Sequence, residues 1–150
     1  MSKASDLVFD CYLPGTLVPP QSATVTGGDF TTTTKAAAVE VTGLSISYTP
    51  PVNCWAFMFC RMRLQCNTAL VRASGSIYID GAITATQAVF LHDAATNLDS
   101  LSMCMVELTA GITYTVTGQC RQDDLGGAQT LRVESDSQYT KLFIIPLNRP

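Results

Sequence analysis

The chain has 150 residues and a mass of 16.1 kDa, which fits one domain that can bury a core without help from disulfides or metals. Only 14% of the residues are charged, against roughly 25% in ordinary soluble domains, so much of the surface must be neutral or covered by other subunits. A net charge of −3 with only nine Lys and Arg argues against a nucleic-acid partner, because phosphate binding needs clustered basic residues. No apolar run approaches the roughly 20 residues of a membrane-spanning helix.

The start of the chain and its cysteines predict a reducing compartment. The first residues lack the hydrophobic stretch of a signal peptide, so we expect the chain to be made and kept in a cytosol. Cys54, Cys60 and Cys66 follow one another six residues apart, which on a strand separates them by roughly 20 Å and exceeds the ~7 Å reach of a disulfide. We therefore expect free thiols that act as small core residues, and no zinc site.

Residues 1–21 predict an extended N-terminal arm. Pro14-Gly15 and Pro19-Pro20 prevent a regular central strand, yet the segment is too apolar to stay in water. We expect the arm to dock on a neighbouring subunit or on a capsid, and residues 22–150 to form a single domain. The apolar side chains expected to make this contact are Leu7, Phe9, Tyr12, Leu13 and Leu17.

Past the arm, the first elements are a loop and a hairpin. The glycines and threonines from Gly27 to Thr34 show turn residues without periodicity, which predicts a mobile loop. The alternating residues of 39–48 then predict two short strands that turn at Thr42-Gly43.

The strongest strand signals come next. Residues 54–66 predict one long strand, and Asp80-Gly81 predicts a two-residue hairpin turn between strands at 71–79 and 82–91. A polar loop through Asn97 leads to a further strand, a tight turn at Thr109-Ala110-Gly111 and a strand with near-perfect alternation.

In that last strand the expected buried residues are Ile112, Tyr114, Val116 and Cys120, and the expected solvent-facing ones are Thr113, Thr115, Thr117, Gln119 and Arg121. Two closing strands at 130–134 and 141–147 bring the total to eight to ten, with no helical periodicity longer than two turns. The sequence thus predicts an all-β fold, an antiparallel β-sandwich of jelly-roll type.

The long strand at 54–66 carries the candidate functional site. One of its faces is entirely apolar, while the other carries the aromatic residues Trp55, Phe57 and Phe59 and then Arg61, Arg63 and Gln65. Three adjacent aromatics in water would form a sticky patch, so something should cover them. Three interpretations stay open: a loop or the arm covers the patch, Trp55, Phe57, Phe59 and Arg61 form a subunit interface around a symmetry axis, or the aromatics are a sugar-stacking platform.

Catalytic and metal-binding motifs are missing from the sequence. His92 is the single histidine and has Asp93 beside it, but neighbours in sequence rarely hold a triad geometry. There is no G-x-S-x-G motif, and Asp123-Asp124 lacks the alternating acidic spacing of a dedicated calcium loop. We expect no enzyme, no cofactor and no metal.

The strand and turn pattern from about 52 to 147 resembles minor structural proteins of tailed bacteriophages and, more remotely, the compact sandwiches of the C1q and tumour-necrosis-factor type. The resemblance rests on the segments at 106–111, 113–116, 131–133 and 142–147 and carries over no functional residue. It implies a virion component, often trimeric, and the missing signal peptide, the free cysteines and the low charge agree with assembly in the host cytoplasm.

The expected function is that of a non-enzymatic capsid decoration or cement protein. Its expected partners are further copies of itself, in a homotrimer, and the major capsid protein or other virion proteins. The alternative is a tail or fibre module that binds a host receptor, in particular a glycan, and a small hydrolase with an unrecognised site is a third possibility.

Overall fold

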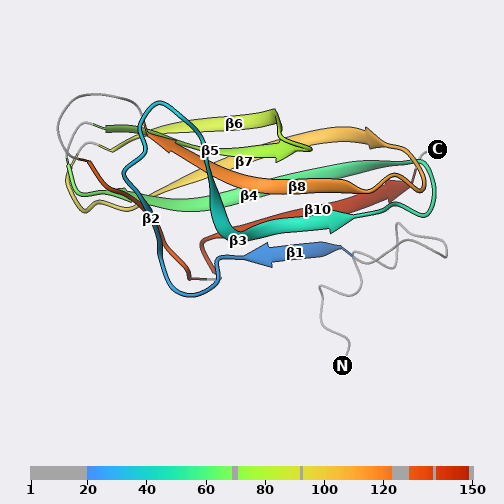
Figure 1. The fold of residues 1–150 in the computed structure, drawn as a ribbon, viewed down its shortest axis with the longest axis horizontal. Coiled ribbons are helices and arrows are strands. Elements are labelled where there is room, and N and C mark those ends of the chain that lie inside the picture. The colour runs from blue at the N-terminus through green and yellow to red at the C-terminus, as the bar shows by residue number, and fades with distance from the viewer. Residues whose placement is uncertain (1–19, 69–70, 92, 123–128, 137, 149–150) are drawn as a thin grey trace.

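The structure is a computed structural model that describes residues 20–68, 71–91, 93–122, 129–136 and 138–148. Ten strands in two sheets make up its regular secondary structure, and the described residues include no helix. The strands run along the long axis of the molecule (Figure 1). The all-β antiparallel sandwich expected from the sequence is confirmed.

The two sheets share the strands unequally. Sheet A has six strands with β4 at its centre: β10 and β9 both pair with one edge of β4, β1 and β2 extend these two, and β7 pairs with the other edge. Its strands are β1 (Gln21–Thr24), β2 (Phe30–Thr32), β4 (Cys54–Cys66), β7 (Leu98–Leu108), β9 (Leu131–Val133) and β10 (Lys141–Asn148). Sheet B has the order β3-β8-β5-β6, formed by β3 (Val39–Tyr48), β5 (Val71–Ile79), β6 (Ala82–Leu91) and β8 (Tyr114–Gln122).

The core lies between the sheets and is organised by β4. Strand β4 has the predicted bounds and the predicted alternation, in which every second side chain from Cys54 to Cys66 is at most 1% exposed. These side chains pack against apolar residues of sheet B such as Leu44, Ile77 and Val116, all fully buried. Period-two apolar patterning therefore places the core as expected.

The β5–β6 hairpin is also confirmed. Asp80 and Gly81 both have positive φ, 50° and 81°, which the two central residues of a type I′ turn need. The Asp80 carboxylate accepts a hydrogen bond from the Thr115 amide at 2.8 Å, and the Asp80 amide donates to the Thr115 carbonyl at 2.9 Å. These contacts fix the hairpin turn to β8.

The first expected hairpin is wrong, because residues 39–48 form one strand, β3. Its pairing with β8 shifts register between Glu40 and Ser45, so Thr42-Gly43 forms a bulge and not a turn. Gly43 has a φ of 90°, and a Cβ there would lie 2.6 Å from the Thr24 carbonyl oxygen. Both conditions require glycine at this position.

The second correction concerns β7 and β8. The turn at Thr109–Gly111 is present, with the Ile112 amide donating to the Thr109 carbonyl at 3.3 Å. However, β7 pairs with β4 in sheet A while β8 pairs with β3 and β5 in sheet B, so the segment crosses between sheets. Ile112, expected to be buried, is 51% exposed on this crossing, and Thr117, expected to face solvent, is 7% exposed.

The N-terminal region contains two strands where none was expected. Strand β1 pairs with β10, and β2 pairs with β9 through Thr31 and Thr32, so the expected loop is wrong for these two threonines. The proposed arm falls on residues 1–19 almost entirely, outside the described residues, and Gln21 already belongs to β1.

The five described cysteines are all free thiols, four buried and Cys104 half-buried.

Candidate functional site: the outer face of sheet A

The solvent-facing side of sheet A brings apolar residues of three neighbouring strands together. Antiparallel pairing sets the residues of β10, β4 and β7 directly opposite one another, so they share one face in continuous rows. The three rows consist of Phe143, Phe59 and Met103; of Ile145, Phe57 and Met105; and of Leu147, Trp55 and Glu107. We call the eight apolar side chains of these rows, together with Leu101, the apolar face of sheet A.

Strand β7 has an inverted pattern of burial. Its small polar residues Ser100 and Ser102 are 0% and 2% exposed in the interior, whereas Leu101, Met103 and Met105 are 40%, 56% and 58% exposed. An isolated domain would place these residues the other way round, because burying a large apolar side chain contributes about 1.5–3 kcal/mol. In the single chain, β7 therefore exposes three large apolar side chains while two of its serines occupy the interior.

The aromatic residues of this face contact one another. The rings of Phe59 and Phe143 stack with centroids 4.5 Å apart and planes inclined by 20°, and the rings of Phe57 and Phe59 are 6.1 Å apart and tilted by 41°. Both separations lie in the range of favourable aromatic pairs. Three phenylalanine rings of β4 and β10 therefore form one continuous cluster on this face.

Charged residues border one end of the apolar face. Asp99 accepts hydrogen bonds from Arg61 and from Arg63, the latter at 3.2 Å, and Arg63 is also 3.7 Å from Glu134. The Arg63 guanidinium carbon lies 3.2 Å from the centroid of the Tyr139 ring, a cation–π contact. Partial burial opposes ionisation of Asp99, but the hydrogen bonds from the two arginines outweigh it and lower the pKa of this carboxyl.

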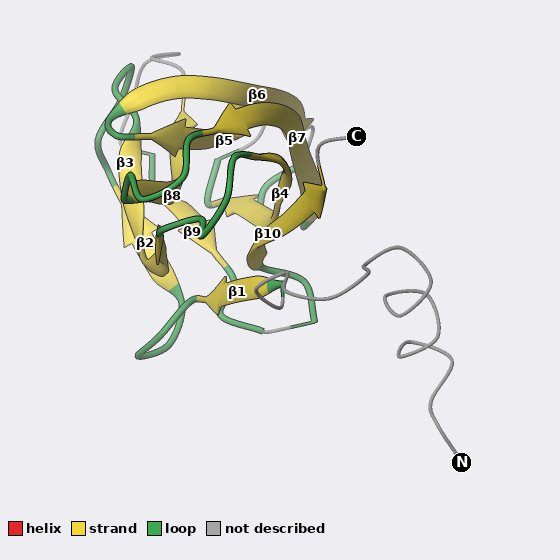
Figure 2. Cartoon of the chain, turned by 90° about the vertical axis from the view of Figure 1, so that its right-hand side faces the viewer, coloured by secondary structure: helices red, strands yellow, loops and turns green. Residues whose placement is uncertain are grey.

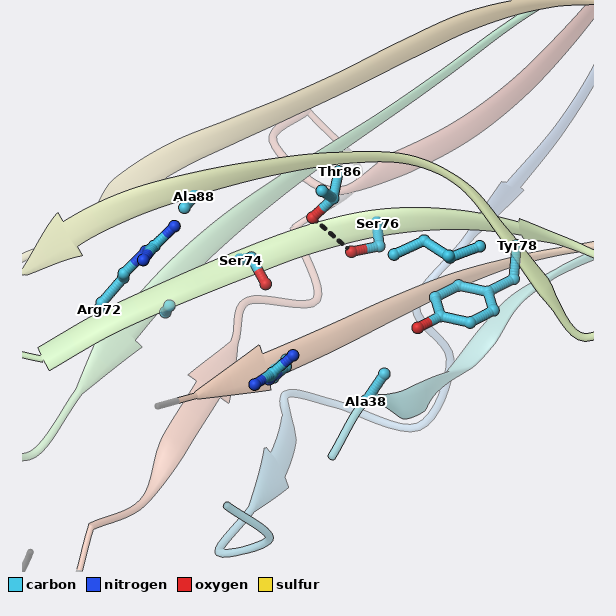
Figure 3. Close-up of a pocket in the computed structure, with 10 residues that line it drawn as sticks. Ala38, Arg72, Ser74, Ser76, Tyr78, Thr86 and Ala88 are labelled. Atoms are coloured by element: carbon cyan, nitrogen blue, oxygen red, sulfur yellow. Dashed lines mark hydrogen bonds between the residues drawn. The ribbon is translucent and has the colours of Figure 1, made fainter. Parts of the chain in front are cut away.

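A second surface feature is a groove of about 210 Å³ on the outer face of sheet B. Its floor consists of short side chains of β5 and β6, while Arg72 and Tyr78 lie toward opposite ends of the row (Figure 3). The Ser76 and Thr86 hydroxyls are 2.8 Å apart at its centre. Arg121 lines the groove from β8.

Known proteins give one informative similarity. No protein-family model and no curated protein matches the sequence. Among solved structures, the Eiger TNF of S. frugiperda superposes with a TM-score of 0.54 at 9% identity, over 89% of this chain and 96% of Eiger. The chain has a TNF-like β-sandwich fold. The GH26-CBM35 β-(1,4)-mannanase of Podospora anserina gives a TM-score of 0.41 at 13% identity, over 88% of this chain and 29% of the mannanase.

This TNF-like sandwich gathers the interface residues expected from the sequence. Trp55, Phe57, Phe59 and Arg61 all lie half-buried on one face of β4. The arm residues Leu7 to Leu17, and also His92, Asp123 and Asp124, lie outside the described residues.

Sequence reasoning missed the contribution of β7 and β10 to the apolar face. The alternation of small residues with large apolar ones from Ser100 to Met105 was the available signal. It predicts one face of small side chains and one face of large ones, and in β7 the face of large side chains is the exposed one. It also missed the groove on sheet B, since β5, β6 and β8 meet there only through strand pairing.

Within the described residues, no helix is long and apolar enough to span a membrane. No group of three or more His, Cys, Asp or Glu residues in the same ranges is arranged to hold a metal ion.

Proposed function

We propose that this chain is a non-enzymatic structural module that assembles into a closed homo-oligomer through the apolar face of sheet A and decorates or cements a virus capsid. The observation that carries the proposal is the inverted burial of β7, which leaves Met103 and Met105 more than half exposed beside three aromatic residues. Contiguous apolar surface of this kind is typical of protein–protein interfaces.

The apolar face of sheet A and the charged residues at its border together resemble the core and rim of a protein–protein interface. Aromatic residues and methionine, which are enriched at interface cores, occupy the rows around Phe57. Arg61, Arg63 and Asp99 satisfy one another at the border, so this rim can remain next to water without unpaired charge. Neighbouring copies placed around a rotation axis would bury the rows against one another and keep the rim solvated.

A trimer is the proposed form of the oligomer. The phage structural proteins and TNF-type sandwiches that the sequence resembles are often trimeric. Rotational symmetry closes such an assembly, because one part of the face contacts one neighbour, a different part contacts the other neighbour, and the closed ring leaves no unsatisfied surface for further growth.

The role in a virion is supported by the same resemblance together with the low surface charge. A decoration protein stabilises an assembled shell by mass action, since it binds the assembled capsid and not its dissociated subunits. The proposed partner is the major capsid protein or another virion protein, met in the host cytoplasm where the five described free thiols would stay reduced.

Electron microscopy of purified particles tests this function. Density for the sandwich at capsid subunit junctions is the expected result, and its absence from the particle would contradict the proposal.

Deleting residues 2–20 gives a second test. The deletion ends before β1, so the thermal transition should stay nearly unchanged while incorporation into particles is lost. An incorporated deletion variant would exclude the arm as the attachment segment.

A receptor-binding tail or fibre module is the second candidate function. The observation that favours it is the groove on sheet B, which lies on the outer face of the sheet opposite the apolar face. The same microscopy separates the two candidates, because a receptor-binding module would occupy the tail tip or a fibre.

A further inference from the structure

The groove on sheet B has the shape and position of a small ligand site. Its volume of about 210 Å³ is below the roughly 300–1,000 Å³ of sites for drug-sized ligands, which suits one or two sugar rings. Ser74 and Tyr78 are four residues apart on β5, which corresponds to a length of about 13 Å. The groove faces away from sheet A, so a copy bound to the apolar face leaves it open.

Polar groups without internal partners converge on this groove. Neither Ser74, Tyr78 nor Arg121 makes a side-chain hydrogen bond or ion pair within the described ranges of the chain. Ser74 and Arg121 are register partners on β5 and β8, which places hydroxyl and guanidinium side by side. Ser76, only 3% exposed, already shares a hydrogen bond with Thr86. The surface thus offers a guanidinium, a phenol and a row of hydroxyls to a ligand.

The chemistry of these groups selects an anion. Among the described residues, Arg72 and Arg121 line the groove and no Asp or Glu does, although the chain as a whole carries a net charge of −3. The attraction for an anion is therefore local. A guanidinium binds a carboxylate through two parallel hydrogen bonds, which fixes its orientation.

Strand pairing argues for a saccharide in place of a peptide. Extended peptides bind sheets by adding a strand to a free edge, but β5 is paired with β6 on one side and β8 on the other. The backbone of the groove floor is consequently not available to a peptide. Side-chain hydroxyls and the Tyr78 ring are the groups that remain, and these suit the hydroxyls and the apolar ring faces of sugars.

We infer that the groove lined by Arg72, Ser74, Tyr78 and Arg121 binds an acidic saccharide, with a uronic-acid carboxylate on Arg121 and a sugar ring against Tyr78. This inference stands apart from the assembly function, because it concerns the opposite sheet and does not require an oligomer.

Calorimetric titration with two matched probes tests it. Cellobiouronic acid carries a carboxylate that cellobiose lacks, so the acidic disaccharide should bind at least about tenfold more tightly at low salt, a difference of about 1.4 kcal/mol. Arg121→Gln should abolish this preference. Tyr78→Ala should weaken both probes, while Tyr78→Phe should retain most of the binding.

Controls make each outcome decisive. Arg132→Gln removes the same charge on β9 of sheet A and should leave binding unchanged, and thermal unfolding of every variant checks that the fold is retained. Equal affinity for the two disaccharides, no binding of either, or an undiminished preference in Arg121→Gln would overturn the inference. Equally tight binding of inorganic sulfate or of a glutamate-containing peptide would overturn the saccharide assignment.

Discussion

The Gly75 amide and the Ser100 hydroxyl lie 3.1 Å apart, although the two residues belong to different sheets. The Ser100 hydroxyl also donates to the Gln87 carbonyl at 2.8 Å, so it bridges the main chains of two residues paired across β5 and β6. Ser102 donates to the Gly75 carbonyl at 2.7 Å. Figure 2 shows β6 and β7 side by side where the sheets meet. Side-chain hydroxyls on β7 thus close this edge of the sandwich.

This closure predicts that Gly75→Ala destabilises the domain by about 1–3 kcal/mol, as overpacking does. An added Cβ would lie 2.9 Å from the Ser100 oxygen and 3.2 Å from the Met62 sulfur. Ser100→Ala should cost about 1–3 kcal/mol, because it leaves buried main-chain groups unpaired.

The double variant should cost less than the sum, because removing the hydroxyl of Ser100 relieves the closest contact of the new methyl group. Denaturant unfolding measures all three variants, with Ser47→Ala, at an exposed position of β3, as the control. Strict additivity would show that the two residues do not interact.

Acid should weaken the fold through Asp29 and Asp99. The Ser135 amide, and then Arg132, lower the pKa of Asp29 below its ordinary 3.8, and Asp99 is lowered because its arginine partners outweigh burial. A carboxyl with a depressed folded-state pKa stabilises the fold above the unfolded-state value, and this contribution is lost as pH falls through the folded-state pKa.

Thermal unfolding midpoints recorded between about pH 5 and pH 2 should therefore fall more steeply in the natural protein than in a variant with Asp29→Asn and Asp99→Asn. Parallel profiles would assign the acid sensitivity to other carboxyls.

The buried thiols should be unreactive in the native protein. Burial raises the pKa of both Cys60 and Cys120 to about 12, which reduces the reactive thiolate by roughly a thousandfold relative to an ordinary cysteine. Alkylation at about pH 8, followed by peptide mass spectrometry, should leave both residues unmodified until the protein is denatured, when six thiols should react. Rapid native labelling of Cys120 would contradict the packing of the two sheets described above.

The elements predictable from the sequence were those whose signal is local. Strand β4 follows from thirteen alternating residues, and the β5–β6 hairpin follows from the positive-φ preference of Asp80-Gly81. The aromatic half of the candidate interface followed from the same alternation, since it fixes which side chains of β4 face outward.

The remaining features depend on distant parts of the chain. The dipeptide Thr42-Gly43 is compatible with either a hairpin turn or a bulge. The structure has a bulge there, at which the main chain of Thr24 from β1 approaches Gly43 closely, and this contact comes from a distant part of the sequence. The turn at Thr109–Gly111 could join two paired strands, but the assignment of β7 to β4 and β8 to β5 is decided by contacts that lie far apart in sequence. The groove arises from the same long-range pairing.

The mass of the purified protein in solution, measured by sedimentation equilibrium, tests the central claim that the apolar face of sheet A joins copies of this chain. We predict a closed oligomer of three 16.1 kDa chains, and monomers or aggregates for Phe57→Asp. Met105→Asp should also give monomers, and as this side chain is 58% exposed the change does not disturb the core. Ile83→Asp, at an equally exposed position on sheet B, should remain oligomeric. A natural protein of 16.1 kDa in solution, or a Met105→Asp variant that stays oligomeric, would contradict the claim.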